Sequence, residues 1–306
     1  MRTPAANAEL ALHLEATAAP TPGNVDRARD HPELTLEHFL AGAVGARSGL
    51  EAAASGAPIG DAFERAVEGM SQQTGTNTQF GALLLLVPLV RAAADGSLDP
   101  AGVDGVVRST TVEDACGFYR AFEHVDVHVG DPPPDLEPLD VRRGVDAIPA
   151  VRERKLSFRD VLAAGADDDD LAREWTTGFE RTFETAARLS GAAGETSIER
   201  DDDAVPVGDW IGDAERLVDR VARTHLALLA ERPDTLVATV HGDGVARSVR
   251  DRAAELLATL PEEQPDIDAI DAFADDLVAQ GINPGTTADH LAAGLFVALE
   301  REEIEV

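Results

Sequence analysis

The sequence predicts an all-α fold: one large multi-helix domain, residues 1–306, whose site is carried by loops at helix N-termini. Apolar residues recur every three or four positions along most of the chain, which is the spacing of an amphipathic helix. Residues that cap helix N-termini precede several of these stretches. Only residues 125–129 and 235–240 are strand-like, and both are too short to imply a sheet.

The helices of the first half are predicted from their first and last residues. An alanine-rich helix should end at the rigid turn Pro-Thr-Pro-Gly-Asn, residues 20–24. The stretch GDAFERAVEGM starts with Asp61 and Glu64 in a capping-box-like arrangement. Another helix should begin at Pro100, directly after Asp99, because proline is favoured at the first helical position.

The second half continues the same pattern. Ser157 and Asp160 form a further capping pair. Residues 170–189 carry large apolar side chains four apart on one face of one expected helix: Leu171, Trp175, Phe179 and Phe183. Further helices are expected at residues 211–231, 244–260, 266–280 and 287–302.

Two loops interrupt the helical pattern. Residues 130–140 are rich in proline, and residues 194–209 are polar. Neither loop is long enough to force a domain boundary. We therefore expect one domain, and a subdivision near residues 130–150 is left open.

The chain is strongly acidic, with a formal net charge of −31 and a single lysine, Lys155. This composition is typical of a salt-adapted cytoplasm, as in a halophilic archaeon, where high ionic strength screens the repulsion between carboxylates. An acidic face for a basic partner is the alternative, but the acids are spread along the whole chain. Because no basic stripe exists to neutralise phosphates, we expect no nucleic acid as a partner.

Cysteine usage and hydropathy further narrow the class of protein to which the chain can belong. Cys116 is the only cysteine, which excludes an internal disulfide and a cysteine-based zinc site. Its apolar helical surroundings predict a core position rather than a nucleophile. The sequence has no signal-peptide pattern, and its longest apolar run, GALLLLVPLV, is too short to span a bilayer. We expect a cytoplasmic protein without a membrane partner, with a homodimer as one expectation for its oligomeric state.

Three small turns lead directly into apolar helices. The first includes residues 20–24, the second residues 75–78, and the third residues 281–287. Gly281 should end one helix in the left-handed conformation, and Thr286 or Thr287 should cap the next. Unpaired N–H groups and the positive end of the helix dipole make such helix starts favourable for anions.

Carboxylates stand close to two of these turns: Asp26 and Glu33 near the first, and Asp289 near the third. A carboxylate can lie beside a phosphate-sized anion when Mg²⁺ bridges the two. Mg²⁺ prefers a few carboxylates together with phosphate oxygens and water. Taken singly, each turn has the residues of an ordinary helix terminus. Taken together, the three turns favour a shared binding site about as strongly as they favour three unrelated helix termini.

Three blocks of the sequence resemble a known family. TPGNVD with the downstream His31, Glu33 and Phe39, then GTNTQFGA, then NPGTTADHLAA resemble, in this order, the signature blocks of the triphosphoribosyl-dephospho-CoA synthase family. RPDTLVATVHGDGVARSV resembles a looser fourth segment. The resemblance implies an all-α enzyme that joins ATP to 3′-dephospho-CoA, with release of adenine, to make a prosthetic-group precursor for citrate lyase or malonate decarboxylase.

The resemblance also implies roles for individual residues. Asp26 and Glu33 are expected to act in catalysis and, with Asp289, to bind Mg²⁺ or contact the ribose. His31 is the expected proton carrier, with an exposed loop histidine as the alternative. Contacts to the nucleotide and its phosphates are expected from Gly23, Asn24, Asn77, Thr78, Gly285 and Thr286.

The sequence departs from the family pattern where that pattern carries cations. Thr21 replaces a lysine between the two prolines, and Gln79 and Phe80 replace a histidine and a lysine or arginine. The candidates to substitute for the missing cations are Arg27, Arg29 and Arg47. A related Mg²⁺-dependent enzyme acting on a different, less highly charged nucleotide or phosphoribosyl substrate is therefore an alternative. A non-catalytic helical binding protein is a second one.

Two further groups of residues are weaker candidates. His124 and His128 lie four residues apart and could share a metal, but alternating valines around them favour surface histidines on an extended segment. The four aspartates at 167–170 are expected to form a solvated helix cap. Asp170 and Glu174 share a helix face from which they could reach a cation.

Overall fold

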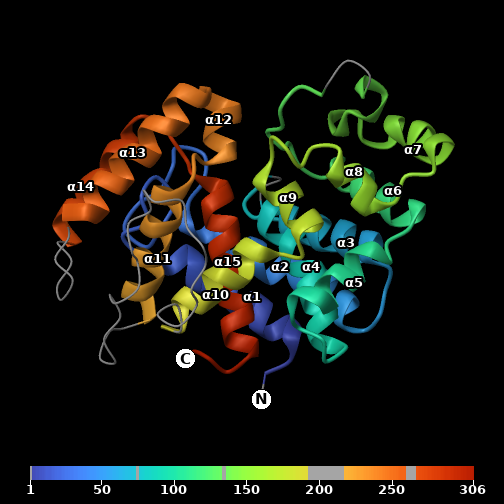
Figure 1. The fold of residues 1–306 in the computed structure, drawn as a ribbon, viewed down its shortest axis with the longest axis horizontal. Coiled ribbons are helices and arrows are strands. Elements are labelled where there is room, and N and C mark those ends of the chain that lie inside the picture. The colour runs from blue at the N-terminus through green and yellow to red at the C-terminus, as the bar shows by residue number, and fades with distance from the viewer. Residues whose placement is uncertain (1, 74–75, 133–135, 192–216, 260–266) are drawn as a thin grey trace.

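The computed structural model describes residues 2–73, 76–132, 136–191, 217–259 and 267–306 (Figure 1). Within these ranges the chain is helical and contains no strand, so the all-α prediction is confirmed. An isolated antiparallel bridge joins Asp26 and Arg29. The α-helices are α1 (Pro4–Thr17), α2 (Leu36–Ala54), α3 (Ile59–Ser71), α4 (Phe80–Ala94), α5 (Pro100–Arg108), α6 (Val112–Ala121), α7 (Ile148–Arg154), α8 (Phe158–Ala163), α9 (Asp170–Thr177), α10 (Glu180–Leu189), α11 (Leu217–Glu231), α12 (Thr235–His241), α13 (Asp243–Thr259), α14 (Ile267–Ala279) and α15 (Gly285–Glu300). Two 3₁₀ helices, η1 (Glu137–Leu139) and η2 (Val141–Ala147), precede α7.

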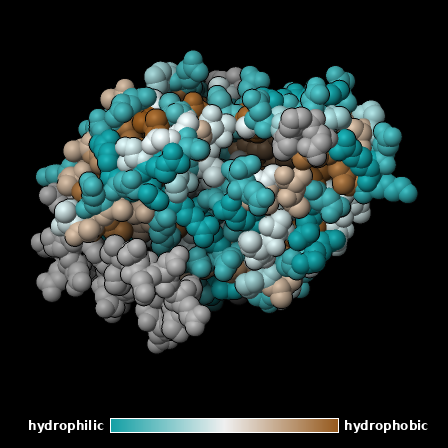
Figure 2. Space-filling model, turned by 45° about the horizontal axis from the view of Figure 1, so that its top comes forward, coloured by the Kyte–Doolittle hydropathy of each residue, from teal (hydrophilic) through white to brown (hydrophobic). Residues whose placement is uncertain are grey.

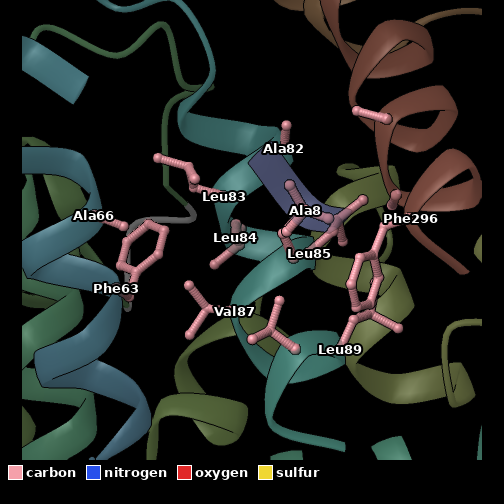
Figure 3. Packing of buried hydrophobic residues seen from close by; sticks show 14 of the residues in the cluster. Ala8, Phe63, Ala66, Ala82, Leu83, Leu84, Leu85, Val87, Leu89 and Phe296 are labelled. Atoms are coloured by element: carbon pink, nitrogen blue, oxygen red, sulfur yellow. The ribbon is translucent and has the colours of Figure 1, made fainter. Parts of the chain in front are cut away.

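Helices α4 and α15 form the centre of the larger core. Most side chains of both helices are buried. A helix that is hydrophobic around its whole circumference needs neighbours on all sides, and α1, α2, α3 and α10 supply them. Figure 3 shows α4 among Ala8 of α1, Phe63 of α3 and Phe296 of α15. The N-termini of these two central helices carry two of the three turns.

Helices α2 and α3 lie close together because small residues face each other. A Cβ atom added to Gly45 would lie 2.1 Å from the carbonyl oxygen of Gly69. A Cβ atom on Gly49 would lie 2.3 Å from the backbone nitrogen of Ala66. This packing fixes α2, whose Phe39 contributes to the wall of the site described below.

A second, smaller apolar cluster joins α11, α12, α13 and α14. Its buried side chains include Leu226, Val237, Val249 and Ile270. In Figure 1, α12, α13 and α14 lie on one side of α15, and α6, α7 and α8 lie on the other. The candidate site lies between these two groups of helices.

Neither strand-like stretch is a strand. Residues 235–240 fall within α12, because the carboxylate of Asp234 accepts a hydrogen bond from the N–H of Val237 at 3.0 Å and caps the helix. The cap and the tertiary packing override the local β propensity of this stretch. Residues 125–129 are irregular.

The single helix expected at residues 170–189 is broken in two. Gly178 and Phe179 both adopt the left-handed conformation, with φ of 72° and 63°, and separate α9 from α10. The break is stabilised by Glu174, whose carboxylate accepts the N–H groups of Arg181 at 3.1 Å and Thr182 at 2.9 Å. The one-helix prediction was wrong, since a pattern of large apolar residues does not reveal a capped break.

Most predicted helix starts are confirmed. Asp99 caps α5 ahead of Pro100, and Ser157 forms a capping box with Asp160 on α8. The exception is Asp61, which lies in the first turn of α3 rather than at its cap, because the helix begins two residues earlier.

The large core continues across the proline-rich segment. Val125, Leu139 and Val151 all belong to it. The subdivision near residues 130–150 stays a prediction, and the predicted loop at 194–209 lies outside the described residues. No described helix combines the length and hydrophobicity that crossing a membrane requires.

Candidate active site

The three turns singled out in the sequence meet in space. The side-chain amide of Asn24 donates to Oδ1 of Asn283 at 2.8 Å and joins the first turn to the third. A Cβ atom on Gly23 would lie 2.6 Å from Cδ of Pro284. Beyond the second turn, a Cβ atom on Gly81 would lie 2.0 Å from Oδ2 of Asp289. At Gly23 and Gly81 only glycine allows this approach.

A cavity of ≈ 840 Å³ opens where the turns meet. One wall is formed by the first turn of α4, the N-terminus of α15 and part of α12. The facing wall is formed by residues 126–132 and 136–141 with α8 and the residues before α9. Figure 2 shows this hollow, with hydrophobic side chains at its floor and hydrophilic side chains around its rim. A concave site of this size is large enough for a small organic ligand.

Seven of the predicted site residues line this cavity: Asn24, Glu33, Asn77, Thr78, Gly285, Thr286 and Asp289. Three do not: Gly23, Asp26 and His31. The structure therefore brings all three turns to one cavity but places part of the first turn behind its wall. Residues 74–75, at the start of the second turn, lie outside the described residues.

Asp26 is held inside its own turn. Its Oδ2 accepts the N–H of Thr21 at 3.1 Å and pairs with Nη1 of Arg29 at 2.9 Å, and its Oδ1 accepts the N–H of Ala28 at 2.7 Å. The side chain is almost fully buried. A carboxylate with this many donors is a strong structural acceptor. These contacts favour a role in shaping the turn over the predicted catalytic and metal-binding roles.

His31 also fastens the first turn. Its Nε2 lies 2.7 Å from the carbonyl oxygen of Gly23, so this nitrogen carries the proton and donates it. The N–H of His31 donates to the carbonyl of Leu34 at 2.9 Å. These contacts favour a positioning role over the predicted role as proton carrier.

Glu15 of α1 is a cavity residue that sequence reasoning missed. It is only 5 % exposed yet lines the cavity. Burial raises its pKa well above the usual value, and the negative charges of Asp289 and Asp26 raise it further. A signal was present in the sequence, because Glu15 follows Ala8 and Ala11 at helical spacing on the apolar stripe of α1, where an acid is out of place.

Asp289 faces the same cavity from α15. Burial raises its pKa well above the usual value, the charge of Asp234 raises it further, and the N–H of Ala82 opposes the shift. Glu15 and Asp289 are thus two buried carboxylates that favour either a proton or a nearby cation. The described residues contain no group of three or more Asp, Glu, His or Cys side chains that could hold a metal alone. A divalent ion here would need oxygen atoms from a bound ligand, as Mg²⁺ commonly does at phosphates.

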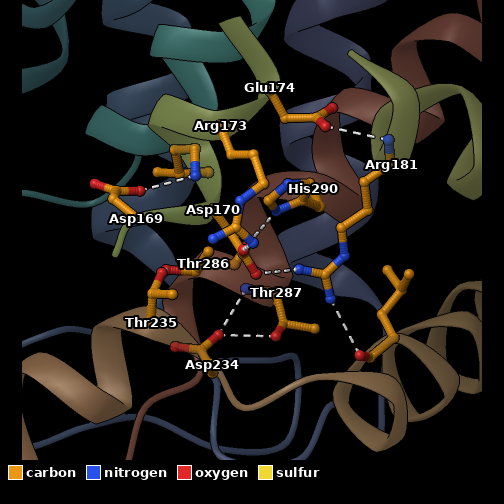
Figure 4. A network of polar contacts seen from close by, with 12 residues as sticks. Asp169, Asp170, Arg173, Glu174, Arg181, Asp234, Thr235, Thr286, Thr287 and His290 are labelled. Atoms are coloured by element: carbon orange, nitrogen blue, oxygen red, sulfur yellow. Dashed lines mark hydrogen bonds and ion pairs between the residues drawn. The ribbon is translucent and has the colours of Figure 1, made fainter. Parts of the chain in front are cut away.

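Asp234 joins the N-termini of α12 and α15. Besides capping α12, it accepts the N–H of Thr287 at 2.7 Å and its hydroxyl at 2.8 Å (Figure 4). The hydroxyl of Thr286 accepts the N–H of Leu236 at 3.2 Å. Thr286 and Thr287 were predicted as caps, but α15 already starts at Gly285, and the two threonines instead bind it to α12.

A buried ion-pair network supports the site from behind. Arg181 donates to Oδ2 of Asp170 at 2.9 Å and to the carbonyl of Leu228 at 3.1 Å (Figure 4). Arg173 pairs with Oδ1 of the same aspartate at 2.6 Å. The cation that Asp170 reaches is therefore an arginine. The expectation of a solvated cap was wrong for this residue, which is buried, whereas Asp169 does cap α9.

Among the described residues that line the cavity there is no lysine or arginine, whereas eight are aspartate or glutamate. None of the three arginines expected to replace the family's cations reaches the wall. Arg29 binds Asp26 and two aspartates of α14, Asp271 and Asp275. Arg47 pairs with surface glutamates of α1 and α2, and Arg27 is exposed.

Cys116, His124 and His128, the weaker candidates from the sequence, lie in different environments. Cys116 is fully buried in α6, as predicted, and burial raises its pKa. Asp126 and His128 lie at the rim of the cavity on the irregular segment after α6, whereas His124 does not line it. The two histidines therefore do not share the cavity wall, which fits the surface interpretation.

Comparisons with known proteins bear on the family and the fold of the chain. The family model described as CitG: ATP:dephospho-CoA triphosphoribosyl transferase matches residues 1–305. A solved structure from Archaeoglobus fulgidus, provisionally described as a triphosphoribosyl-dephospho-CoA synthase, superimposes with a TM-score of 0.62 and 24% sequence identity. The match covers 87% of this chain and 98% of that one. At this identity the likeness establishes the shared fold. No curated protein matches the chain.

Proposed function

The chain belongs to the ATP:dephospho-CoA triphosphoribosyl transferase family, and we propose that it transfers the triphosphoribosyl group of ATP to dephospho-CoA. A ribose hydroxyl of dephospho-CoA attacks the anomeric carbon of ATP, the new C–O bond forms, and the bond from that carbon to adenine breaks. The proton lost by the hydroxyl balances the one that adenine gains. The observation that carries this proposal is the convergence of the three turns on one acid-lined cavity.

The residues of the cavity suggest a division of roles. Asn77, Thr78 and Thr286 offer side-chain hydrogen bonds to phosphates, next to the positive end of the α15 dipole. Glu33 is the exposed carboxylate of the first turn and accepts the hydroxyl proton. The carboxylates of the cavity stabilise positive charge on the ribose as adenine leaves.

Mg²⁺ fits the chemistry of this donor set. Glu15 and Asp289 would hold it, because both are acids on the cavity wall whose pKa values are raised, first by burial and then by neighbouring carboxylates. The ion would neutralise the triphosphate in a cavity whose described lining contains no lysine or arginine. The protein itself contributes the carboxylates, the helix terminus and the exclusion of water.

The test is adenine release. Protein incubated with ATP, Mg²⁺ and dephospho-CoA should release free adenine, quantified by chromatography, only when all three are present. Asp289→Asn should abolish release. Glu113→Gln, which alters only an exposed pair with Arg152, should not. Absence of adenine above an enzyme-free blank would exclude this pair of substrates.

A related substrate pair is the second candidate. It is favoured by Thr21 and Phe80, where the family pattern carries cations, and by the acidic cavity wall. A screen of nucleotides for thermal stabilisation separates the two candidates. The largest shift with dephospho-CoA supports the first, and a larger shift with another nucleotide or a phosphoribosyl compound supports the second.

The remaining proposals concern the cellular setting. The net charge of −31 and the single lysine support a salt-adapted cytoplasm as the environment of the protein. A homodimer and the absence of nucleic acid among its partners stay predictions. Size-exclusion chromatography with light scattering in concentrated KCl tests the first of these.

A further inference from the structure

One half of the cavity is lined mainly by apolar side chains and adjoins the half at the acidic turns. Side chains from α4, from residues 118–132 and 136–141, and from α8 meet there. The principal ones are Phe80, Leu84, Phe118, Phe122, Leu139 and Leu162. An open hollow lined by side chains of this kind is unfavourable in water unless a ligand covers it. This half of the cavity is therefore suited to an occupant without charge.

The aromatic part of this wall is held rigidly. The rings of Phe80 and Phe122 lie 4.9 Å apart at 61°, and those of Phe118 and Phe122 lie 5.2 Å apart at 88°. Phe80 is also packed edge-on against Phe63 at 5.1 Å. Edge-to-face contacts of this kind fix the rings relative to one another. The apolar surface is thus formed before a ligand arrives.

The charges around this half disfavour phosphate. Asp126, Asp131 and Asp140 line it together with His128, and none of its described lining residues is a lysine or an arginine. An anionic group at this end would meet carboxylates and phenyl rings without the buried pair, Glu15 and Asp289, that would hold a neutralising Mg²⁺ in the other half, so the occupant should be uncharged.

The apolar half adjoins the acidic half along one turn of α4. Phe80 and Leu84 are four residues apart and share a helix face on the apolar wall. Gly81, between them, abuts the carboxylate of Asp289. A single ligand can therefore have its reacting ribose near Asp289 and an uncharged arm along Phe80 and Phe122, with the diphosphate that joins these two parts of dephospho-CoA at the boundary between the halves.

We propose that this apolar half binds the uncharged pantetheine arm of the acceptor, and that Phe122 is a specificity-determining residue for it. The inference rests on the proposed function and adds to it the part of the cavity that the acceptor occupies. The triphosphate of the donor then occupies the acidic half, near Glu15, Asn77 and Thr286.

Pantetheine itself is the probe, because it is the neutral arm without the nucleotide. In steady-state assays of the wild-type protein it should inhibit competitively against dephospho-CoA and not against ATP. Phe122→Ala should raise both its inhibition constant and the KM for dephospho-CoA about tenfold or more, with the KM for ATP unchanged. Loss of one ring from an apolar pocket produces an effect of this size.

Phe158→Leu is the matched control. Phe158 packs against Phe118 at 4.7 Å in the same aromatic cluster but does not line the cavity, so it should weaken folding without changing either KM. Competition of pantetheine with ATP, or an equal change of both KM values in Phe122→Ala, would overturn the inference. Adenine release by the wild-type protein reports separately on the proposed function.

Discussion

At the scale of single residues, the site depends on a contrast between two buried aspartates. Asp26 is surrounded by donors from its own turn, including Arg29, so its charge is fully compensated. Asp289 has other carboxylates as neighbours, so its charge is not compensated. A buried charge without a partner is costly and is retained where it serves binding or catalysis. Replacement by asparagine, which removes the charge, should therefore change the stability of the protein in opposite directions at the two positions.

Asp26→Asn should destabilise the protein by about 3 kcal/mol, because Arg29 and the N–H donors of the turn lose a charged acceptor. Asp289→Asn should leave stability unchanged or raise it, and should abolish adenine release. Denaturant unfolding and the adenine assay on both variants measure this contrast. An Asp26→Asn variant that is stable but inactive would show that Asp26 acts in catalysis, as the sequence predicted.

Glu15→Gln should make the protein without ligand more stable at neutral pH. The pKa of Glu15 is raised in the folded protein above its usual value of 4.5, so the folded state holds a proton that the unfolded state releases. The free energy of unfolding therefore falls as pH rises from 4.5 towards the raised value. Thermal melts of both proteins across this range, at constant KCl, should show a flatter profile for the variant. A variant that is less stable at every pH would contradict this.

At the scale of elements, the cavity depends on how helix ends are joined. Asp234 caps α12 and also binds the first turn of α15, so one carboxylate orients two helices of the same cavity wall. Arg29 similarly ties the first turn to α14 through Asp271 and Asp275. These contacts join residues that are far apart in the sequence but adjacent in the structure. They explain why turns without helical structure of their own can form a defined cavity.

Asp234→Ala should cost about 2–4 kcal/mol, because it removes two helix-terminal acceptor sites, each worth about 1–2 kcal/mol. It should also raise the KM for ATP, because the N-terminus of α15 loses its anchor. Asp99→Ala is the control, since Asp99 caps only α5 and does not line the cavity. It should cost about 1 kcal/mol and leave KM unchanged. Equal KM effects in both variants would show that Asp234 acts only on stability.

The elements also show how far the sequence could predict the structure. Caps are local, so the starts at Asp99 and Ser157 were predicted correctly. The break at Gly178 was missed because it depends on Glu174 accepting backbone N–H groups across the turn. Within the site, the three turns could be predicted from their glycines and caps. The inward position of Glu15 could be suspected from its stripe, whereas the burial of Asp26 behind the cavity wall, among donors of its own turn, could not be read from the pattern of residues.

At the scale of the whole molecule, charge dominates. A net charge of −31 on 306 residues makes the compact state repel itself, and the acidic cavity adds local repulsion. Salt shortens the range of this repulsion, from a Debye length of about 10 Å at ~0.1 M to about 3 Å at ~1 M. Stability and affinity for anionic nucleotides should therefore both increase with salt.

Raising KCl from ~0.1 M to ~1 M should raise the Tm and lower the KM for ATP at fixed Mg²⁺. Most nucleotide sites with basic side chains behave in the opposite way, because salt screens their attraction. Sucrose at equal osmolality is the control, since it changes the hydration of the surface without screening charge. A KM that rises with KCl would indicate basic groups in the site that the described residues do not include.

The most direct test of the account is the position of a divalent ion and nucleotide in a crystal of the protein grown with Mn²⁺ and ATP. Anomalous scattering should place Mn²⁺ between Glu15 and Asp289, with the triphosphate over Asn77, Thr78 and Thr286. A manganese peak outside this cavity, or a nucleotide bound away from the three turns, would contradict it.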